Sequence, residues 1–193
     1  HEAKNKLNIP YDKKVIFATG GSQGAKTIND SMIKLLKPLS EDMNYFVILQ
    51  TGKKNYENVI NELENIYPEF QNNKNLLIKP YFDESVYPMK AADIVISRAG
   101  SVSLSEIIQC AAVSVLIPYP YAAQDHQRKN AKEMCEKGVS LYLEDSECND
   151  ITLMEKIKEL TPDKLLEMSK KTKLMSKSNP TEEIVNQLKS TIK

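Results

Sequence analysis

The sequence predicts an α/β fold with a doubly wound, parallel sheet of six strands and a C-terminal helical extension. Short apolar runs rich in β-branched residues alternate with amphipathic stretches of helical period along most of the chain. Parallel strands joined by helices of this length require right-handed crossovers, which is the Rossmann-like arrangement. The chain, residues 1–193, is expected to form one such domain, with residues 150–193 as its helical tail.

Each element is predicted from its local pattern. Pro162 and Pro180 are expected to break the helical tail. The polar lead, residues 2–14, is assigned no element. The expected strands are residues 15–18, 45–49, 76–78, 93–96, 113–117 and 140–143, and the expected helices before the tail are residues 26–39, 55–67, 86–92, 103–112 and 125–137.

Composition excludes several function classes. Twenty-six basic residues balance 26 acidic ones, so there is no basic excess for a nucleic-acid partner. No apolar run approaches the ~18 residues of a membrane span. The three cysteines fit neither a disulfide framework nor a metal site, and they indicate a reduced, cytoplasmic protein. A hydrophobic content of 41% is sufficient for a sizeable core.

Four loops are candidates for ligand binding because they follow the carboxyl ends of predicted strands, where doubly wound sheets bind ligands. They are residues 20–25, 80–83, 98–103 and 118–127. The two arginines, Arg98 and Arg128, lie in or next to these loops. A planar guanidinium suits a phosphate better than an ammonium does, so both arginines are candidate phosphate ligands.

The loop GGSQGA, residues 20–25, is rich in glycine and precedes a helix. Its backbone N–H groups at Ser22 and Gly24 can bind a phosphate at the helix N-terminus. Ala25 interrupts a Walker motif, and the glycines do not form G-x-G-x-x-G. Gln50 also stands where a dinucleotide-binding domain has an acidic ribose ligand. The loop therefore disfavours an ATPase or a dehydrogenase.

The stretch SRAGSVSLSE, residues 97–106, combines a strand end, a glycine turn and a helix start. Ser101 or Ser103 is expected to cap the helix. Glu106, in the first turn, either caps backbone donors or faces a ligand hydroxyl. The competing interpretation is an ordinary strand-to-helix loop with a capping box.

The stretch YPYAAQDHQRKN, residues 119–130, gathers polar side chains at a helix start, as recognition of a sugar's hydroxyls requires. The competing interpretation is a solvated helix start capped by Asp125. Adjacent helical residues point apart, so Asp125 and His126 are not expected to form a catalytic pair. No nucleophile motif and no carboxylate cluster for a metal is present, and no catalytic residue is assigned to this chain.

Three motifs together resemble the MurG family, bacterial transferases that add N-acetylglucosamine to lipid I to make lipid II. They are GGSQGA at 20–25, SRAG with Ser103 and Ser105-Glu106 at 97–106, and PYP with DHQ and NA at 118–131. The resemblance implies the C-terminal, donor-binding half of an inverting GT-B glycosyltransferase. It further implies no metal or other cofactor, a lipid I acceptor held by the N-terminal half, and a peripheral location on the cytoplasmic face of the bacterial inner membrane. The chain alone is expected to bind the donor, UDP-N-acetylglucosamine, without catalysis.

The same resemblance implies roles for individual residues. Ser22 would contact the diphosphate, the backbone of Phe82 the uracil edge, and Glu106 the ribose hydroxyls. Gln127, and less surely His126, would contact the sugar. The full expected set is Gly21, Ser22, Gln23, Gly24, Phe82, Arg98, Gly100, Ser101, Val102, Ser103, Leu104, Ser105, Glu106, His126 and Gln127.

Three alternatives stay open at the level of sequence. One is the donor-binding subunit of a split transferase that makes dolichol-linked chitobiose. Another is a different UDP-sugar enzyme of the same architecture, either a GT-B transferase or an epimerase. The third is a UDP-sugar sensor or a purely structural domain.

Overall fold

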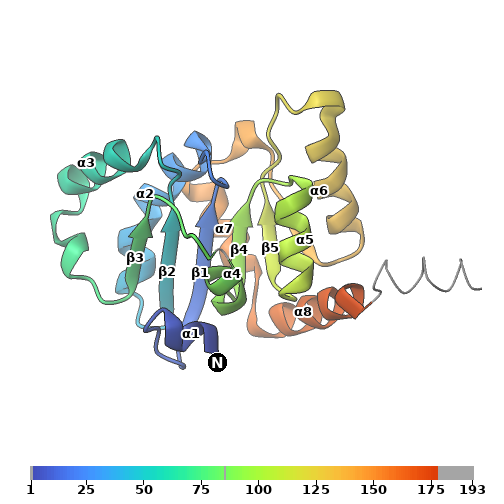
Figure 1. Cartoon of the computed structure of the whole chain (residues 1–193), viewed down its shortest axis with the longest axis horizontal. Helices are drawn as coiled ribbons and strands as arrows, with labels where there is room; N and C mark the ends of the chain where they lie inside the picture. Colours follow the sequence, from blue (N-terminus) through green and yellow to red (C-terminus); the bar gives the residue numbers. More distant parts are fainter. Residues whose placement is uncertain (1, 85, 178–193) are drawn as a thin grey trace, which may run out of the picture.

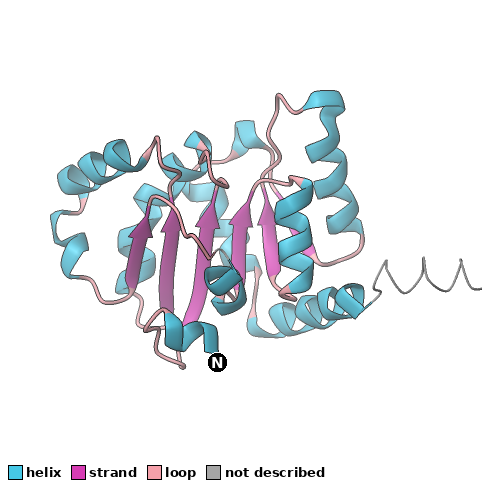
Figure 2. Cartoon of the chain, viewed as in Figure 1, coloured by secondary structure: helices cyan, strands magenta, loops and turns pink. Residues whose placement is uncertain are grey.

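A computed structural model describes residues 2–84 and 86–177 of the chain. Its centre is a parallel sheet with the strand order β3-β2-β1-β4-β5-β6. Figures 1 and 2 show its strands side by side. This confirms the doubly wound, six-stranded fold predicted from the sequence. The strands are β1 (Lys14–Thr19), β2 (Tyr45–Gln50), β3 (Leu76–Lys79), β4 (Ile94–Ser97), β5 (Val113–Leu116) and β6 (Ser140–Tyr142).

The helices follow the predicted alternation. Pro162 begins a new helix, as expected, whereas the expected break at Pro180 lies outside the described residues. The α-helices are α1 (Glu2–Lys6), α2 (Lys26–Glu41), α3 (Tyr56–Ile66), α4 (Val86–Ala91), α5 (Ser101–Gln109), α6 (His126–Glu136), α7 (Asp150–Glu159) and α8 (Pro162–Lys177), and the short 3₁₀ helices are η1 (Pro68–Asn72), η2 (Ala123–Asp125) and η3 (Asp145–Glu147).

Three local expectations were wrong. The polar lead contains α1, where no element was assigned. Helix α5 starts at Ser101, two residues early, and Gly100 occupies its N-cap without a side-chain hydrogen bond, so neither Ser101 nor Ser103 caps it, and Glu106 lies in its second turn instead of its first. Asp125 occupies the N-cap of α6 but its side chain caps no backbone donor. Its carboxylate instead accepts from Arg128 at 2.8 Å, because the αL backbone at Asp125 removes it from capping geometry.

The two faces of the sheet have separate cores. In β1, Ile16 and Ala18 face one core with residues of α2, α3 and α7, whereas Val15 and Phe17 face the other with residues of α1, α4, α5 and α6. Successive side chains of a strand point to opposite faces, so helices must cover both. In the view of Figure 1, α4, α5 and α6 lie in front of the sheet.

The order of the strands reverses between β1 and β4, the neighbours at the middle of the sheet. Chain connections leave to opposite sides at this point, which leaves a crevice at the carboxyl ends of the strands. These ends point upward in Figure 1, and the four candidate loops gather there. Helix α8 lies at the opposite edge, where Ser169 Oγ donates to the Ala111 carbonyl at 3.1 Å. Among the described residues, no helix has the length and apolarity needed to cross a membrane.

Candidate functional site

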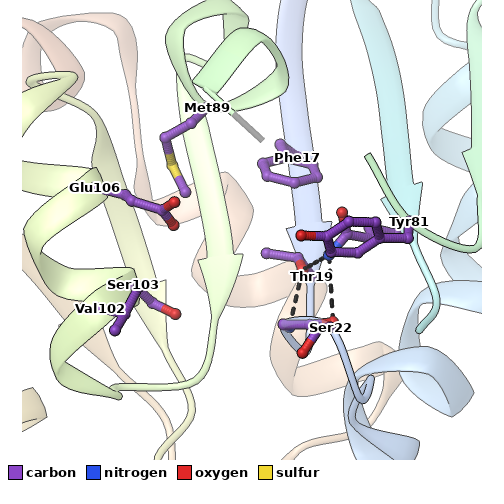
Figure 3. Close-up of a pocket in the computed structure, with 10 residues that line it drawn as sticks. Phe17, Thr19, Ser22, Tyr81, Met89, Val102, Ser103 and Glu106 are labelled. Atoms are coloured by element: carbon purple, nitrogen blue, oxygen red, sulfur yellow. Dashed lines mark hydrogen bonds between the residues drawn. The ribbon is translucent and has the colours of Figure 1, made fainter. Parts of the chain in front are cut away.

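A pocket of about 350 Å³, here called pocket A, lies at the reversal point of the sheet. Figure 3 shows Val102, Ser103 and Glu106 on α5 across from Thr19, Ser22 and Tyr81, with Met89 of α4 nearby. One part of the wall is apolar and another carries hydroxyl and carboxylate groups. Its lining residues are Phe17, Thr19, Gly21, Ser22, Gln50, Tyr81, Met89, Val102, Ser103 and Glu106.

Gln50 holds the loops around pocket A together. Its Nε2 donates to Thr19 Oγ1 at 3.0 Å and to the Gly21 carbonyl at 3.2 Å. Its Oε1 accepts from the Phe82 N–H at 3.1 Å. The side chain is almost fully buried, so these bonds replace those to water. One carboxamide at the end of β2 thus fixes the loop after β1 and the loop after β3.

The glycine-rich loop after β1 requires glycine because of close backbone contacts. Gly24 has φ +76°, and a Cβ there would lie 2.1 Å from the Thr51 carbonyl oxygen. Gly52 has φ +83°, and its Cβ would lie 2.4 Å from the Gly24 nitrogen. Two glycines from different loops therefore pack backbone against backbone, which no other residue type permits.

Two helices direct their N-termini at the pockets. The N-cap residues Ala25 of α2 and Gly100 of α5 provide no side-chain hydrogen bond. The first N–H groups of a helix have no intrahelical partner and carry the positive end of the helix dipole. Uncapped starts of this kind are suited to an anionic group such as a diphosphate.

A second pocket of about 630 Å³, here called pocket B, adjoins pocket A, and Ser103 lines both. It extends from the glycine-rich loop toward the loop between β5 and α6. Its remaining lining residues are Gly20, Gln23, Gly24, Ala25, Lys26, Thr27, Arg98, Gly100, Tyr119, Pro120, Tyr121, Gln127 and Asp145.

The orientation of Gln127 in pocket B is set by its backbone partner. The Tyr119 N–H donates to Gln127 Oε1 at 3.0 Å. The amide nitrogen Nε2 lies on the side of Gly100, 3.9 Å from where a Cβ on that glycine would stand. Gln127 therefore offers N–H donors to a ligand in pocket B. The neighbouring His126 is exposed, and its Nδ1 lies 2.6 Å from the Ala123 carbonyl.

Both arginines are paired with carboxylates, and of the two only Arg98 lines a described pocket. Arg98 Nη1 contacts Asp145 Oδ1 at 2.5 Å, with both side chains largely buried. Arg128 contacts Glu144 at 3.0 Å and Asp125 at 2.8 Å, on the surface. Glu144 and Asp145, which come shortly after β6, thus each form an ion pair with one arginine.

The surface cluster around Glu144 shifts the pKa of its members. Hydrogen bonds from Tyr142 and Arg128 lower the pKa of Glu144. Burial and the Glu144 hydrogen bond raise the pKa of Tyr142 to about 12. Hydrogen bonds to Glu144 and Asp125 raise the pKa of Arg128.

The structure brings most of the predicted site residues to these pockets. Pocket A receives Gly21, Ser22, Val102, Ser103 and Glu106, and pocket B receives Gln23, Gly24, Arg98, Gly100, Ser103 and Gln127. The remaining five line neither pocket: Phe82 and Leu104 are buried in the core, and Ser101, Ser105 and His126 are exposed.

Sequence reasoning missed several lining residues. Phe17 is buried in a strand and was assigned to the sheet, whereas Thr19 and Gln50 lie one residue beyond the strands predicted at 15–18 and 45–49 and were assigned no contact with a ligand. Their positions at or near the carboxyl ends of strands were the only available signal. Tyr81, Tyr119 and Tyr121 lie within loops that had been singled out as candidates, although the tyrosines themselves had not. Asp145 follows the last strand and carried no signal.

A parallel sheet whose strand order reverses at pocket A, with uncapped helix starts facing the adjoining pocket, is the ligand-binding arrangement of a Rossmann-like, doubly wound domain. Residues 15–188 match the glycosyltransferase family 28 C-terminal domain, and the chain belongs to this family. The resemblance drawn from the three loop motifs is thereby confirmed.

Named relatives agree with this assignment. The chain is 35% identical over 193 residues to the UDP-N-acetylglucosamine–N-acetylmuramyl-(pentapeptide) pyrophosphoryl-undecaprenol N-acetylglucosamine transferase of Caldanaerobacter subterraneus subsp. tengcongensis, covering 98% of this chain and 51% of the relative. The Desulforamulus reducens protein of the same name is 32% identical, covering 93% of this chain and 49% of the relative. The chain spans about half the length of these curated relatives.

Solved structures give the same fold. The crystal structure of Acinetobacter baumannii MurG has a TM-score of 0.76 at 25% identity, covering 97% of this chain and 53% of that one. The C-terminal CMP-Kdo binding domain of Acinetobacter baumannii WaaA has a TM-score of 0.63 at 8% identity, covering 89% of this chain and 92% of that one. The second likeness shows the fold alone.

Proposed function

We propose that this chain is the donor-binding half of an inverting glycosyltransferase that moves N-acetylglucosamine from UDP-N-acetylglucosamine to undecaprenyl-pyrophosphoryl-MurNAc-pentapeptide, converting lipid I to lipid II in peptidoglycan synthesis. The observation that carries the proposal is the junction of pockets A and B at Ser103, between two uncapped helix starts. A nucleoside diphosphate sugar has three parts in line, and this junction offers a place for each. The names of the relatives supply the sugar and the acceptor.

The nucleotide is proposed to bind in pocket A. Glu106 would accept hydrogen bonds from the ribose hydroxyls, and the backbone at Phe82 would contact the uracil edge. The Phe82 N–H already donates to Gln50, so a uracil carbonyl at this backbone shares that donor with Gln50. The apolar wall of Phe17, Tyr81 and Met89 suits the faces of a base.

The diphosphate is proposed to lie at the junction, near Ser22 and the starts of α2 and α5, and the sugar in pocket B. Gln127 would donate from Nε2 to a sugar hydroxyl. His126 would contribute only from the rim, since its side chain is exposed and lines neither pocket. The remaining residues of the proposed site are Gly21, Gln23, Gly24, Arg98, Gly100, Ser101, Val102, Ser103, Leu104 and Ser105.

The chemistry assigned to this half is stabilisation of the leaving UDP. Preorganised N–H groups at the helix starts face the place where the diphosphate gains negative charge, and they need no reorganisation when the bond breaks. We therefore propose transfer without a metal or other cofactor. The acceptor hydroxyl would attack the anomeric carbon directly, with a base from the N-terminal half.

The acceptor and the cellular location follow from the same proposal. Lipid I would be held by the N-terminal half, with the donor half facing it across a cleft. The complete enzyme would be a peripheral protein on the cytoplasmic face of the bacterial inner membrane. The chain alone would bind donor and catalyse nothing, and lipid II formation by the isolated chain would contradict this.

Calorimetric titration of the chain with UDP-N-acetylglucosamine, UDP-galactose, UDP and ADP tests the proposal. We expect saturable binding of the uridine ligands, with UDP-N-acetylglucosamine bound more tightly than UDP-galactose and no binding of ADP. Equal binding of ADP and UDP would overturn the assignment of pocket A to a uridine nucleotide. Equal binding of the two UDP-sugars would overturn the assignment of the sugar.

A further inference from the structure

Arg98 connects three segments that border pocket B. Its Nη1 donates to the Ile117 carbonyl at 3.1 Å and to the Pro118 carbonyl at 3.3 Å, in addition to Asp145. Its guanidinium also lies 5.5 Å from the centre of the Tyr119 ring. The arginine, from the loop after β4, thereby holds the chain leaving β5 at three consecutive residues.

The segment held by Arg98 in turn orients Gln127. The Tyr119 N–H, the next backbone donor along the chain, bonds to Gln127 Oε1. With Oε1 engaged, the Nε2 donors are the part of Gln127 that remains for a ligand in pocket B. If the segment 117–119 shifted, the amide of Gln127 would lose the partner that sets its orientation.

Asp145 stabilises the arginine at the start of this series of contacts. The exposed fractions of the Arg98 and Asp145 side chains are 12% and 17%, so neither is solvated well. Removing one partner of a largely buried ion pair leaves the other charge unpaired in a poorly solvated place. Without Asp145, the guanidinium of Arg98 would therefore gain free energy by moving toward solvent. Asp145 belongs to η3, after β6, and it is 47 residues from Arg98 in the sequence.

We propose that Asp145 is a positioning residue for sugar recognition, acting through Arg98 and the segment 117–119 to orient the Gln127 amide toward the donor sugar. This inference rests on the proposed function, because it takes pocket B to hold the sugar. It assigns to Arg98 a carboxylate-anchored, positioning role in place of a direct phosphate contact. None of the residues in this series, from Asp145 through Arg98 and 117–119 to Gln127, lines pocket A. We therefore expect the loss of affinity to concern the sugar and not the nucleotide.

The test compares UDP with UDP-N-acetylglucosamine on the 193-residue chain by calorimetry. Asp145→Asn keeps the shape of the side chain and removes its charge. We expect the ratio of the two affinities to fall by up to about tenfold, the value of one hydrogen bond, with UDP affinity unchanged. Glu144→Gln is the matched control, because the adjacent carboxylate pairs with Arg128 on the surface, and its ratio should equal that of the unmodified chain.

A double-mutant cycle separates positioning from general destabilisation. If Asp145 acts through Gln127, Asp145→Asn changes the ratio little once Gln127→Ala is present, and the two effects are not additive. Additive effects, an unchanged ratio, or equal losses for both ligands would each overturn the inference. Arg98→Lys, which keeps the cation and loses the planar fork, is the second variant should Asp145→Asn not fold, and it should lower the ratio in the same way.

Failure of the proposed function gives a different result from failure of this inference. An unmodified chain that binds neither ligand would overturn both. An unmodified chain that binds UDP and UDP-N-acetylglucosamine, with the ratio unaltered in Asp145→Asn, would leave the donor-binding function standing and remove Asp145 from sugar recognition.

Discussion

Pockets A and B lie side by side at the same edge of the sheet, yet they are held in shape by different means. Around pocket A, the loops after β1 and β3 are fixed by the buried carboxamide of Gln50, whereas the backbone contact between Gly24 and Gly52 holds the part of the loop after β1 that borders pocket B. Around pocket B, the loop after β5 is fixed by the side-chain ion pair of Arg98 and Asp145. Pocket A thus depends on a buried, neutral carboxamide, and pocket B depends on a largely buried ion pair.

Under the proposed function, this difference bears on how the nucleotide and the sugar of a donor would be recognised. The carboxamide of Gln50 holds the loops after β1 and β3 at the same time, and this fixed arrangement of pocket A would suit the constant part of a nucleotide sugar. The contacts of Arg98 and Asp145 can each be altered by one substitution. We therefore expect substitutions around pocket B to change the preference for the donor sugar. The following predictions test which contacts hold the loops around each pocket, and they are ordered from the largest expected effect to the smallest.

Gly24→Ala should have the largest effect. The new Cβ would meet the Thr51 carbonyl at 2.1 Å in a left-handed backbone at φ +76°, so the loop after β1 must move. We expect a loss of about 3 kcal/mol or more in the free energy of unfolding, together with loss of UDP binding. Urea denaturation and calorimetry measure the two.

Gly21→Ala is the control for Gly24→Ala. Gly21 has the same kind of backbone, with φ +77°, but a Cβ there meets nothing within 4 Å. Its loss should be limited to the backbone strain, about 1 kcal/mol. Equal losses in the two variants would show that conformation alone, and not the close backbone contact, requires glycine at position 24.

Gln50→Met should have the next largest effect. Methionine fills a similar volume but leaves the Phe82 N–H without its buried acceptor and removes one of the two hydrogen bonds to the Gly21 carbonyl. We expect a loss of about 2–3 kcal/mol in the free energy of unfolding and weaker binding of UDP. Gln71→Met, at an exposed position, is the control. If the Gln50→Met chain were as stable as this control, Gln50 would not be needed to hold the two loops together.

Glu106→Gln tests the ribose contact without altering the fold of α5. A hydroxyl forms a stronger hydrogen bond with an ionised carboxylate than with a neutral amide oxygen. We therefore expect UDP to bind about tenfold more weakly to Glu106→Gln. Binding of 2′-deoxy-UDP should change less, because this ligand lacks one of the two ribose hydroxyls, and an equal change for both ligands would contradict the ribose contact. Gln109→Ala, on the exposed part of the same helix, should leave both ligands unaffected.

Glu144→Gln should have the smallest effect on stability, and the effect should be present at neutral pH and lost in acid. Hydrogen bonds in the folded state lower the pKa of Glu144, so its stabilising contribution is present above the unfolded pKa of about 4.3. This contribution disappears as the pH falls through the lower, folded pKa. Melting temperatures of the two chains should therefore differ at pH 7 and converge below pH ~4. The pair is exposed to solvent, so salt should reduce the difference.

Local pattern was enough to predict much of the fold and part of the site. The strand observed at 94–97 was predicted at 93–96, and the helix after it at 103–112, because their apolar residues have the right periodicity within a short stretch of sequence. The glycine-rich loop was predicted as a site for a similar reason, since glycine at a strand end implies a backbone that approaches something closely.

The partners of polar side chains could not be predicted in the same way. Arg98 and Arg128 were interpreted as phosphate ligands because a guanidinium suits a phosphate, but it suits a carboxylate equally well. Which of the two it meets depends on Glu144 and Asp145, far along the chain. Gln50 was noted only as the absence of an acidic residue, since its three partners come from two other loops.

The sequence by itself therefore determined the strands, the helices, the class of fold and the loops that carry the site, because periodicity and turn chemistry act between near neighbours. Only the tertiary structure decided how the two pockets join, which arginine pairs with which carboxylate, and which way the amides of Gln50 and Gln127 point. Those outcomes depend on contacts between segments brought together by the crossovers of the sheet, and no local pattern encodes such contacts.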